Sequence, residues 1–290
     1  MPKVKRKIFR IITWGGAGDV LLLTPVLKTL KEEFYNCKII IYGSSSAMEI
    51  YKNNPYIDRL TTFSFYKNPV FAVQYFFKLT KFYRTNFQWI PLSYIYNVSV
   101  PYIIADIFNV TLKDKKVQVY LTAKEEQRAR NFLNQYKNSV IIHVTSKCSV
   151  NHMWQHKKWD QLVAEMPDYT FIQVGLESEQ AVKGAIDLRG KTSMREAMAL
   201  IKYTNYFVGI ESFFAHVTNA FDTPGVVMFG DSSPVFWGHD NNINLYKSLP
   251  CSPCYDLLGG KKCPYGNECM SLITVDEVKK SIMKLQESIV

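Results

Sequence analysis

Two groups of residues in this 290-residue chain have types and spacing suited to chemistry. The first is the glycine loop Gly15-Gly16-Ala17-Gly18-Asp19, whose glycines allow a ligand to approach backbone N–H groups closely. It is neither the G-x-G-x-x-G pattern of dinucleotide-binding proteins nor a P-loop. Asp19 can cap the helix that follows, or it can act as a general base toward an acceptor hydroxyl.

The second group is the cysteine finger, Cys251-x2-Cys254-x8-Cys263-x5-Cys269. Prolines and glycines between the cysteines favour a compact knuckle, and four thiolates suit a closed tetrahedral metal site. Zinc is the default ion and iron is the alternative, because thiolates bind both. Unligated or disulfide-bonded cysteines are the competing interpretation. Four ligands leave no open coordination position, so the site is expected to be structural.

The elements that must position these groups follow from hydrophobic patterning. Short apolar, β-branched runs predict buried strands at residues 8–12, 38–42, 140–144, 170–174, 206–209 and 226–229. Helices are predicted at residues 44–52, 124–137, 158–165, 194–202, 214–220 and 275–289, and another runs to Phe34 that either begins near Thr24 or is kinked at Pro25. Strands alternating with helices indicate parallel sheets, with ligands at the carboxyl ends of the strands. We expect two α/β domains, residues 1–137 and 138–290.

Residues 61–105 are rich in aromatic side chains and carry only Lys and Arg as charges. Three interpretations stay open for this segment. It can belong to the core of the first domain, it can form a platform on which rings stack on sugars or bases, or it can rest on an anionic membrane.

The composition bounds the partners and the compartment. The net charge of 35 − 25 = +10 favours polyanions such as nucleotide phosphates, phosphorylated glycans, anionic membrane or nucleic acid, although excess lysine can also serve solubility alone. No secretory signal and no apolar run of about 18 residues is present, so we expect a cytoplasmic protein. In a reducing compartment the six cysteines are expected to be thiols or metal ligands.

Several elements, taken together and in order, resemble bacterial heptosyltransferases of glycosyltransferase family 9. The first half contributes the run from Trp14 to Pro25 and Asn54-Pro55-Tyr56-Ile57-Asp58. The second half contributes Thr145-Ser146, Lys157-Lys158-Trp159, the segment from Asp187 to Ser193, the segment from Gly209 to His216, and Thr223-Pro224 to Gly230. The resemblance covers most of the chain outside residues 61–120.

The resemblance implies a GT-B fold, in which two doubly wound Rossmann-like domains face each other across a cleft. The first domain would be the acceptor side and the second would bind the nucleotide sugar, most typically ADP-heptose. Asp19 would be the catalytic base of an inverting transfer. The donor and its phosphates would be bound by Gly16, Gly18, Thr145, Ser146, Lys157, Glu211, Ser212 and His216. The cysteine finger is similar to that of the iron-containing autotransporter heptosyltransferases.

No catalytic metal is expected, because a lysine and a helix N-terminus can stabilise the departing diphosphate. Glu211 stands where the family usually has Asp or Asn, and Phe213 stands where it usually has Gly. Both differences should reshape the sugar pocket.

The leading hypothesis is therefore an inverting glycosyltransferase that moves a sugar, heptose above others, to a hydroxyl on a bacterial glycan, a lipid-linked core or a protein. Peripheral contact with the inner membrane fits the basic charge. A transferase acting on modified DNA bases is a second hypothesis, with nucleic acid the less favoured partner. An inactive binding or scaffold protein of the same fold is a third.

Overall fold

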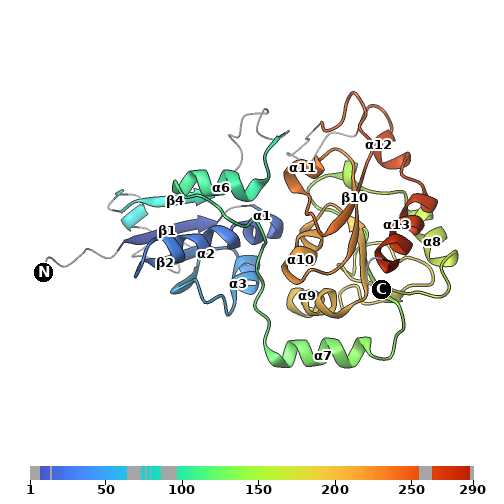
Figure 1. Cartoon of the computed structure of the whole chain (residues 1–290), viewed down its shortest axis with the longest axis horizontal. Helices are drawn as coiled ribbons and strands as arrows, with labels where there is room; N and C mark the ends of the chain where they lie inside the picture. Colours follow the sequence, from blue (N-terminus) through green and yellow to red (C-terminus); the bar gives the residue numbers. More distant parts are fainter. Residues whose placement is uncertain are drawn as a thin grey trace, which may run out of the picture. The chain divides into compact units, whose positions relative to one another are not determined.

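The computed structural model describes residues 7–13, 15–63, 73–75, 77–78, 80–85, 97–254 and 263–287. The chain divides into two compact units, one formed by residues 1–94 and 98–120 and the other by residues 95–97 and 121–290 (Figure 1). Helix α7 (Ala123–Leu133), which precedes the expected junction at residue 137, packs against α9 (Met194–Tyr203) within the second unit.

The first unit is built on a parallel sheet with the strand order β3-β2-β1-β4. Its strands are β1 (Ile8–Thr13), β2 (Lys38–Gly43), β3 (Arg59–Thr62) and β4 (Phe82–Thr85), and its helices include α1 (Ala17–Leu22), α2 (Thr24–Glu33), α3 (Ser45–Tyr51) and α6 (Val100–Phe108). The break predicted near Pro25 separates α1 from α2. Proline fits in the first turn of α2 because the N–H that it lacks would have no helical partner there.

The described part of the aromatic segment packs on the first sheet. Phe82 lies 5.6 Å from Tyr42 and 5.7 Å from Tyr75 between ring centroids, in edge-on contacts. Tyr83 stacks on Phe108 of α6 with centroids 4.8 Å apart. These rings contribute to the core of the first unit, whereas residues 64–72 and 86–96 of the segment lie outside the described residues.

The second unit holds a six-stranded parallel sheet in the order β10-β9-β8-β5-β6-β7. The strands are β5 (Ser139–His143), β6 (Thr170–Gln173), β7 (Ile186–Asp187), β8 (Tyr206–Ile210), β9 (Gly225–Phe229) and β10 (Asn242–Tyr246). Counted from β5, this is the doubly wound order 3-2-1-4-5-6, which reverses between β5 and β8. Ligands of such sheets bind beyond the carboxyl ends of the strands at that reversal.

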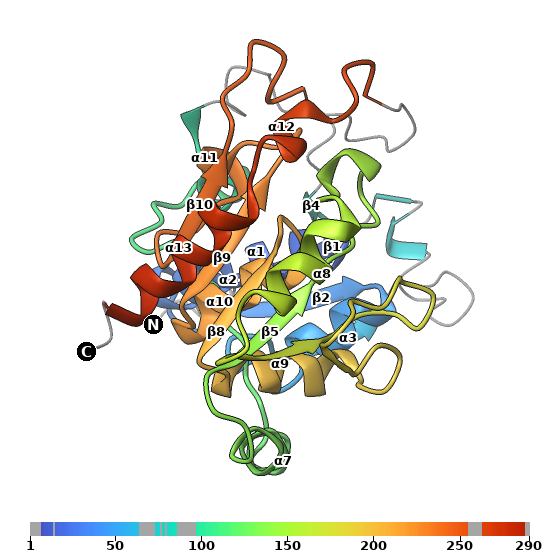
Figure 2. The same cartoon turned by 90° about the vertical axis from the view of Figure 1, so that its right-hand side faces the viewer.

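Helices cover both faces of the second sheet. Helices α8 (His156–Ala164) and α13 (Val275–Glu287) lie on one face, and α9 and α10 (Phe213–Phe221) lie on the other (Figures 1 and 2). Shorter turns follow the strands: η1 (Val150–His152), α11 (Pro234–Trp237) and α12 (Glu268–Ser271). Trp159 of α8 is fully buried in this core.

An ion pair between a buried arginine and a partly exposed glutamate connects α7 to α9. Thr122 and Glu125 form a capping box at the start of α7. The Glu125 carboxylate also accepts hydrogen bonds from Arg195 Nε (2.6 Å) and Nη2 (2.8 Å), and Arg195 is only 3% exposed. Hydrogen bonds from Arg195 lower the pKa of Glu125 from its ordinary value of 4.5 to about 2, although burial opposes that shift.

Replacing Glu125 by Gln should lower the free energy of unfolding at neutral pH by about 2 kcal/mol, because the buried Arg195 guanidinium would lose the charge of the Glu125 carboxylate. The folded-state pKa of Glu125 is depressed, so its contribution is complete above pH 4.5 and is lost as the pH falls toward about 2. Urea unfolding across this range should show the two proteins converging. The matched control Glu165→Gln, which removes an exposed pair with Lys279, should change little. A constant difference between wild type and Glu125→Gln at all pH values would contradict this assignment.

Candidate active site

The glycine loop of the first unit is built around the Asp19 carboxylate. Gly15 has a φ of +103°, in the left-handed region that favours glycine. The backbone N–H of Gly16 donates to Asp19 Oδ2 at 2.7 Å. A Cβ atom added to Gly15 would lie 2.2 Å from that oxygen, whereas one added to Gly16 would lie 3.7 Å from it. Asp19 does cap a helix, but from its third position in α1 (Ala17–Leu22) and not from the position before the helix, which Gly16 occupies. Its role as a base stays a prediction.

A hydrogen bond from α3 stabilises α1, the helix that carries Asp19. The hydroxyl of Tyr51, which is 1% exposed, donates to the Val20 carbonyl of α1 at 2.6 Å. Burial, and secondarily the charge of Asp19, raises the pKa of Tyr51 well above its ordinary value. The hydroxyl therefore stays protonated and keeps this hydrogen bond at physiological pH. Gly18 lies in the first turn of α1, one residue before Asp19.

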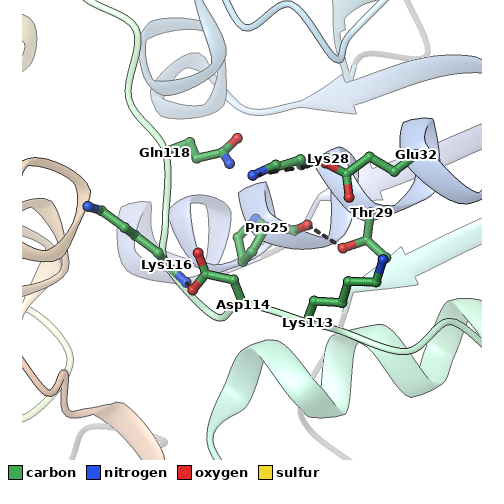
Figure 3. Close-up of a pocket in the computed structure, with 8 residues that line it drawn as sticks. All are labelled: Pro25, Lys28, Thr29, Glu32, Lys113, Asp114, Lys116 and Gln118. Atoms are coloured by element: carbon green, nitrogen blue, oxygen red, sulfur yellow. Dashed lines mark hydrogen bonds and ion pairs between the residues drawn. The ribbon is translucent and has the colours of Figure 1, made fainter.

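The first unit also contains a cavity of about 260 Å³ between α2 and the segment that follows α6 (Figure 3). It is lined by Pro25, Lys28, Thr29, Glu32, Lys113, Asp114, Lys116 and Gln118. Three lysines and two carboxylates share the lining, and Lys28 Nζ lies 4.0 Å from Glu32 Oε1. None of the lining residues is among the site residues predicted from the sequence, and the mixed charges give the cavity little preference for anions.

In the second unit, polar side chains meet where β5 and β8 end. His143, the last residue of β5, has its Nδ1 3.0 Å from the hydroxyl oxygen of Ser212, which follows β8. Its ring lies edge-on to Phe214, with centroids 4.8 Å apart. Burial lowers the pKa of His143 to about 4, although the charge of Glu179 opposes the shift. The His143 imidazole is therefore neutral and orients the Ser212 hydroxyl.

Thr145 is joined to the loop that follows β6. Its hydroxyl donates to Glu179 Oε2 at 2.6 Å, and Glu179 Oε1 accepts from the Leu176 N–H at 2.9 Å. Gly175 has a φ of +147°, and a Cβ added to it would lie 2.3 Å from Glu179 Oε2. The β6 loop thus encloses a carboxylate, as the glycine loop encloses Asp19.

A buried strand-end network of ionisable groups connects the ends of β5, β8 and β9. His152 Nε2 lies 2.6 Å from Asp231 Oδ1, and His152 Nδ1 lies 3.4 Å from Glu211 Oε2. Ser149 donates its hydroxyl hydrogen to Asp231 Oδ2 at 2.6 Å. The Ser146 hydroxyl lies 3.3 Å from His152 Nδ1. The predicted residues Ser146 and Glu211 are therefore brought together around one histidine.

His216 extends this strand-end network from α10. Its Nε2 lies 3.8 Å from Glu211 Oε1, and its Nδ1 lies 2.8 Å from His239 Nε2. Burial lowers the pKa of His216 to about 4, so this imidazole is neutral, and one of the two rings donates the hydrogen of the contact with His239. The structure thus joins the predicted residues Glu211 and His216.

The structure does not join the predicted site residue Lys157 to the other predicted residues of the second unit. It lies exposed in the first turn of α8. Among the interactions of the described residues, none links Lys157 to Thr145, Ser146 or Glu211. Its neighbour Lys158 instead donates to the Ser271 and Ile273 carbonyls at 2.5 and 2.9 Å, which ties α8 to the segment before α13.

The four cysteines of the finger are thiols that form no disulfide with one another. Burial, and then the charges of Asp231, Cys263 and Cys251, raises the pKa of the Cys254 thiol. Burial raises the pKa of Cys269 to about 11.

Within the described residues, no group of three or more His, Cys, Asp or Glu side chains is arranged to hold an ion. The donor set itself, four thiols, is chemically suited to zinc or iron. The finger is attached to the strand-end loops: Cys254 N–H donates to the Asp231 carbonyl and Cys263 N–H donates to Asn151 Oδ1, each at 3.1 Å.

Sequence reasoning did not identify five polar residues of the site: His143, His152, Glu179, Asp231 and His239. Two of them carried a usable signal. His143 lies within the predicted strand 140–144, and Asp231 follows the predicted strand 226–229 directly after Gly230. A polar residue immediately beyond a buried parallel strand is a candidate ligand contact. The other three lie in loops or turns whose paths the sequence pattern does not indicate.

Comparison with known proteins gives one family. The family model described as glycosyltransferase family 9 (heptosyltransferase) matches residues 98–262. Lipopolysaccharide heptosyltransferase 3 of Escherichia coli (strain K12) is 22% identical, over 76% of this chain and 81% of that protein.

Solved structures share the fold. The glycosyl transferase family 9 structure from Veillonella parvula has a TM-score of 0.73 at 13% identity, and covers 99% of both chains. The iron-containing dodecameric glycosyltransferase TibC from enterotoxigenic Escherichia coli has a TM-score of 0.75 at 18% identity, covering 98% of this chain and 77% of TibC. TibC has also been solved in complex with ADP-D-β-D-heptose (TM-score 0.74, 19% identity, the same coverage). The predicted α/β fold of the GT-B class is confirmed. No helix among the described residues has the length and apolar character needed to span a bilayer.

The geometry of the glycine loop predicts a sharp contrast between neighbouring positions. Gly15→Ala should lower the free energy of unfolding by about 2 kcal/mol, because the new side chain would both meet the Asp19 carboxylate and occupy a left-handed conformation. Gly16→Ala, with an ordinary φ of −75°, should cost only about 0.5 kcal/mol. Parallel urea titrations of the two variants measure the difference. Equal losses would show that the loop is not packed around Asp19.

Proposed function

The chain belongs to glycosyltransferase family 9, and from this premise we propose that it transfers heptose from ADP-heptose, with inversion at the anomeric carbon, to an acceptor hydroxyl. The acceptor class is a bacterial glycan, a lipid-linked core or a protein. The observation that carries the proposal is the gathering of Ser146, Glu211, Ser212 and His216 at the ends of β5 and β8, where the second sheet reverses its strand order. The complex of TibC with ADP-D-β-D-heptose, in the same fold, supports the choice of donor.

The second unit would bind the donor. Ser146 and Ser212 would supply hydroxyl donors for the diphosphate, as would Thr145 once its hydroxyl turns from Glu179 to the phosphate. The N-terminus of α10 begins immediately after Ser212. Lys157 stays the predicted lysine contact, reached from the start of α8. As the glycosidic bond breaks, negative charge grows on the departing diphosphate, and these groups stabilise it. Glu211 and His216 would line the sugar side of the pocket.

The first unit would supply the base. Asp19 would accept the proton of the acceptor hydroxyl as its oxygen attacks the anomeric carbon and ADP leaves. One Asp19 oxygen already accepts the Gly16 N–H, and this hydrogen bond fixes the direction of the carboxylate. The backbone N–H of Gly18 would contact the ligand, and at Gly16 the missing side chain would let the ligand approach the backbone. We infer that the enzyme works in the cytoplasm, with peripheral contact at the inner membrane when its acceptor is lipid-linked.

A turnover assay tests the proposed function directly. The purified protein should release ADP from ADP-heptose in the presence of acceptor extract, and should release less nucleotide from UDP- or GDP-sugars. Failure to bind or turn over any nucleotide sugar would overturn the proposal.

Asp19→Asn tests the base in the same assay. Asparagine can still accept the Gly16 N–H but cannot accept a proton from the acceptor, so kcat should fall by a factor of about 100 or more while the donor KM stays within about twofold. Asp106→Asn, which changes an exposed carboxylate on α6, is the matched control and should be fully active. Unchanged turnover by Asp19→Asn would remove Asp19 as the base.

We also propose a structural metal ion, iron or zinc, on Cys251, Cys254, Cys263 and Cys269. The iron-containing TibC, with the same fold, supports iron, and the four-thiol donor set is compatible with either ion. The ion would stabilise the segment that is attached to Asp231 and Asn151 at the strand ends.

Metal analysis of the purified protein should find one iron or zinc ion per chain. Cys254→Ser should lose the ion and melt roughly 5–10 °C lower, because binding of a structural ion contributes to folding free energy. Cys148→Ser, which changes an exposed thiol outside the finger, should keep both the ion and the melting temperature. A metal-free wild-type protein that is as stable as one supplied with iron or zinc would contradict the assignment.

A further inference from the structure

His152 has an unusual position in the second unit. It ends η1, is 7% exposed, and lies between two carboxylates that follow different strands. Its Nε2 is 2.6 Å from Asp231 after β9, and its Nδ1 is 3.4 Å from Glu211 after β8. One imidazole therefore couples the ends of two neighbouring strands.

The Asp231 side of this contact is the fixed side. Asp231 is 2% exposed, accepts the Ser149 hydroxyl hydrogen at 2.6 Å, and receives the Cys254 N–H on its backbone carbonyl. Ser149 caps the same short helix that carries His152. Both the ring and its partner are thus held by neighbouring backbone, and the His152 ring has little freedom to rotate.

The Glu211 side of the contact is the one that faces the predicted donor residues. Glu211 Oε1 lies 3.8 Å from His216 Nε2. The Nδ1 atom of His216 lies 2.8 Å from His239 Nε2 and makes a hydrogen bond with it. His216 is neutral, because burial lowers its pKa to about 4. For His152, burial lowers the pKa but the carboxylates of Glu211 and Asp231 raise it further, so the net shift is upward. The His152 imidazole is therefore shifted toward its protonated form beside Glu211.

The length of the Glu211 side chain matters for this contact. An aspartate at position 211 would draw the carboxylate back by about 1.5 Å, one carbon–carbon bond. The Glu211 Oε2 to His152 Nδ1 distance is already 3.4 Å, so a shorter carboxylate would lose the contact. A longer carboxylate at residue 211 and a histidine at residue 152 form a matched pair.

We infer that His152 is a positioning residue for the donor's sugar: it holds the Glu211 carboxylate in the orientation that meets the sugar hydroxyls. The inference rests on the proposed function, because it takes the donor to be a nucleotide sugar bound at these strand ends. His152 need not touch the sugar itself. Its role is to fix the direction of the Glu211 carboxylate oxygens, which accept hydrogen bonds from the sugar hydroxyls.

Calorimetric titration with ADP-heptose and with ADP, on wild type and variants, tests the inference. His152→Gln should weaken binding of ADP-heptose about tenfold and leave ADP binding within about twofold, because the sugar half alone loses its partner. Glu211→Asp should do the same. The double variant should be no weaker than either single variant, because both changes break one contact. The matched control His156→Gln, in a partly exposed histidine of α8, should bind both ligands as wild type does.

The outcomes separate this inference from the proposed function. Wild-type protein that binds neither ADP nor ADP-heptose overturns the proposed function and the inference with it. Wild-type protein that binds both, with His152→Gln unchanged or equally weakened toward ADP and ADP-heptose, overturns the positioning role alone. Melting temperatures give a readout without ligand. Losses from His152→Gln and Glu211→Gln that add fully in the double variant would show that the two side chains do not interact.

Discussion

The burial of the Glu211 carboxylate is the constraint on which the second unit depends. Burial raises the pKa of Glu211, because a charged carboxylate removed from water is costly without a cationic partner, and the nearby His152 charge opposes that shift. His152 in turn requires Asp231, and Asp231 is held by Ser149 and by the backbone of the cysteine finger. Through His152 and Asp231, the buried Glu211 carboxylate thereby connects the ends of β5, β8 and β9 to the cysteine finger.

Parallel topology explains why these groups meet. In both units every described strand pair is parallel, so the carboxyl ends of the strands in each sheet lie along one edge. The same architectural device appears in each: a glycine with positive φ lets a loop close on a carboxylate, Gly15 on Asp19 and Gly175 on Glu179. Because glycine has no side chain, each loop leaves room for a carboxylate. A side chain at Gly15 or Gly175 would collide with the carboxylate of Asp19 or Glu179.

Many of the strands and helices could be predicted from the sequence, because runs of β-branched residues that end at a glycine are typical of buried strands. The strands around residues 8–12 and 140–144 and the break before Pro25 are examples. The strand β10, which is half-buried and polar, lacks that signal. The strand-end network was harder to predict, because periodicity indicates which face is buried but not which side chains meet. His152 lies in a turn, and Lys157 matched the family pattern by spacing although its side chain is exposed.

The central claim is that the donor nucleotide binds at the carboxyl ends of β5 and β8. A crystal structure of the protein with ADP tests it most directly. We expect the diphosphate within hydrogen-bonding distance of Thr145, Ser146 or Ser212, and the nucleotide next to the strand-end network. ADP bound elsewhere on the second unit, away from those strand ends, would contradict it.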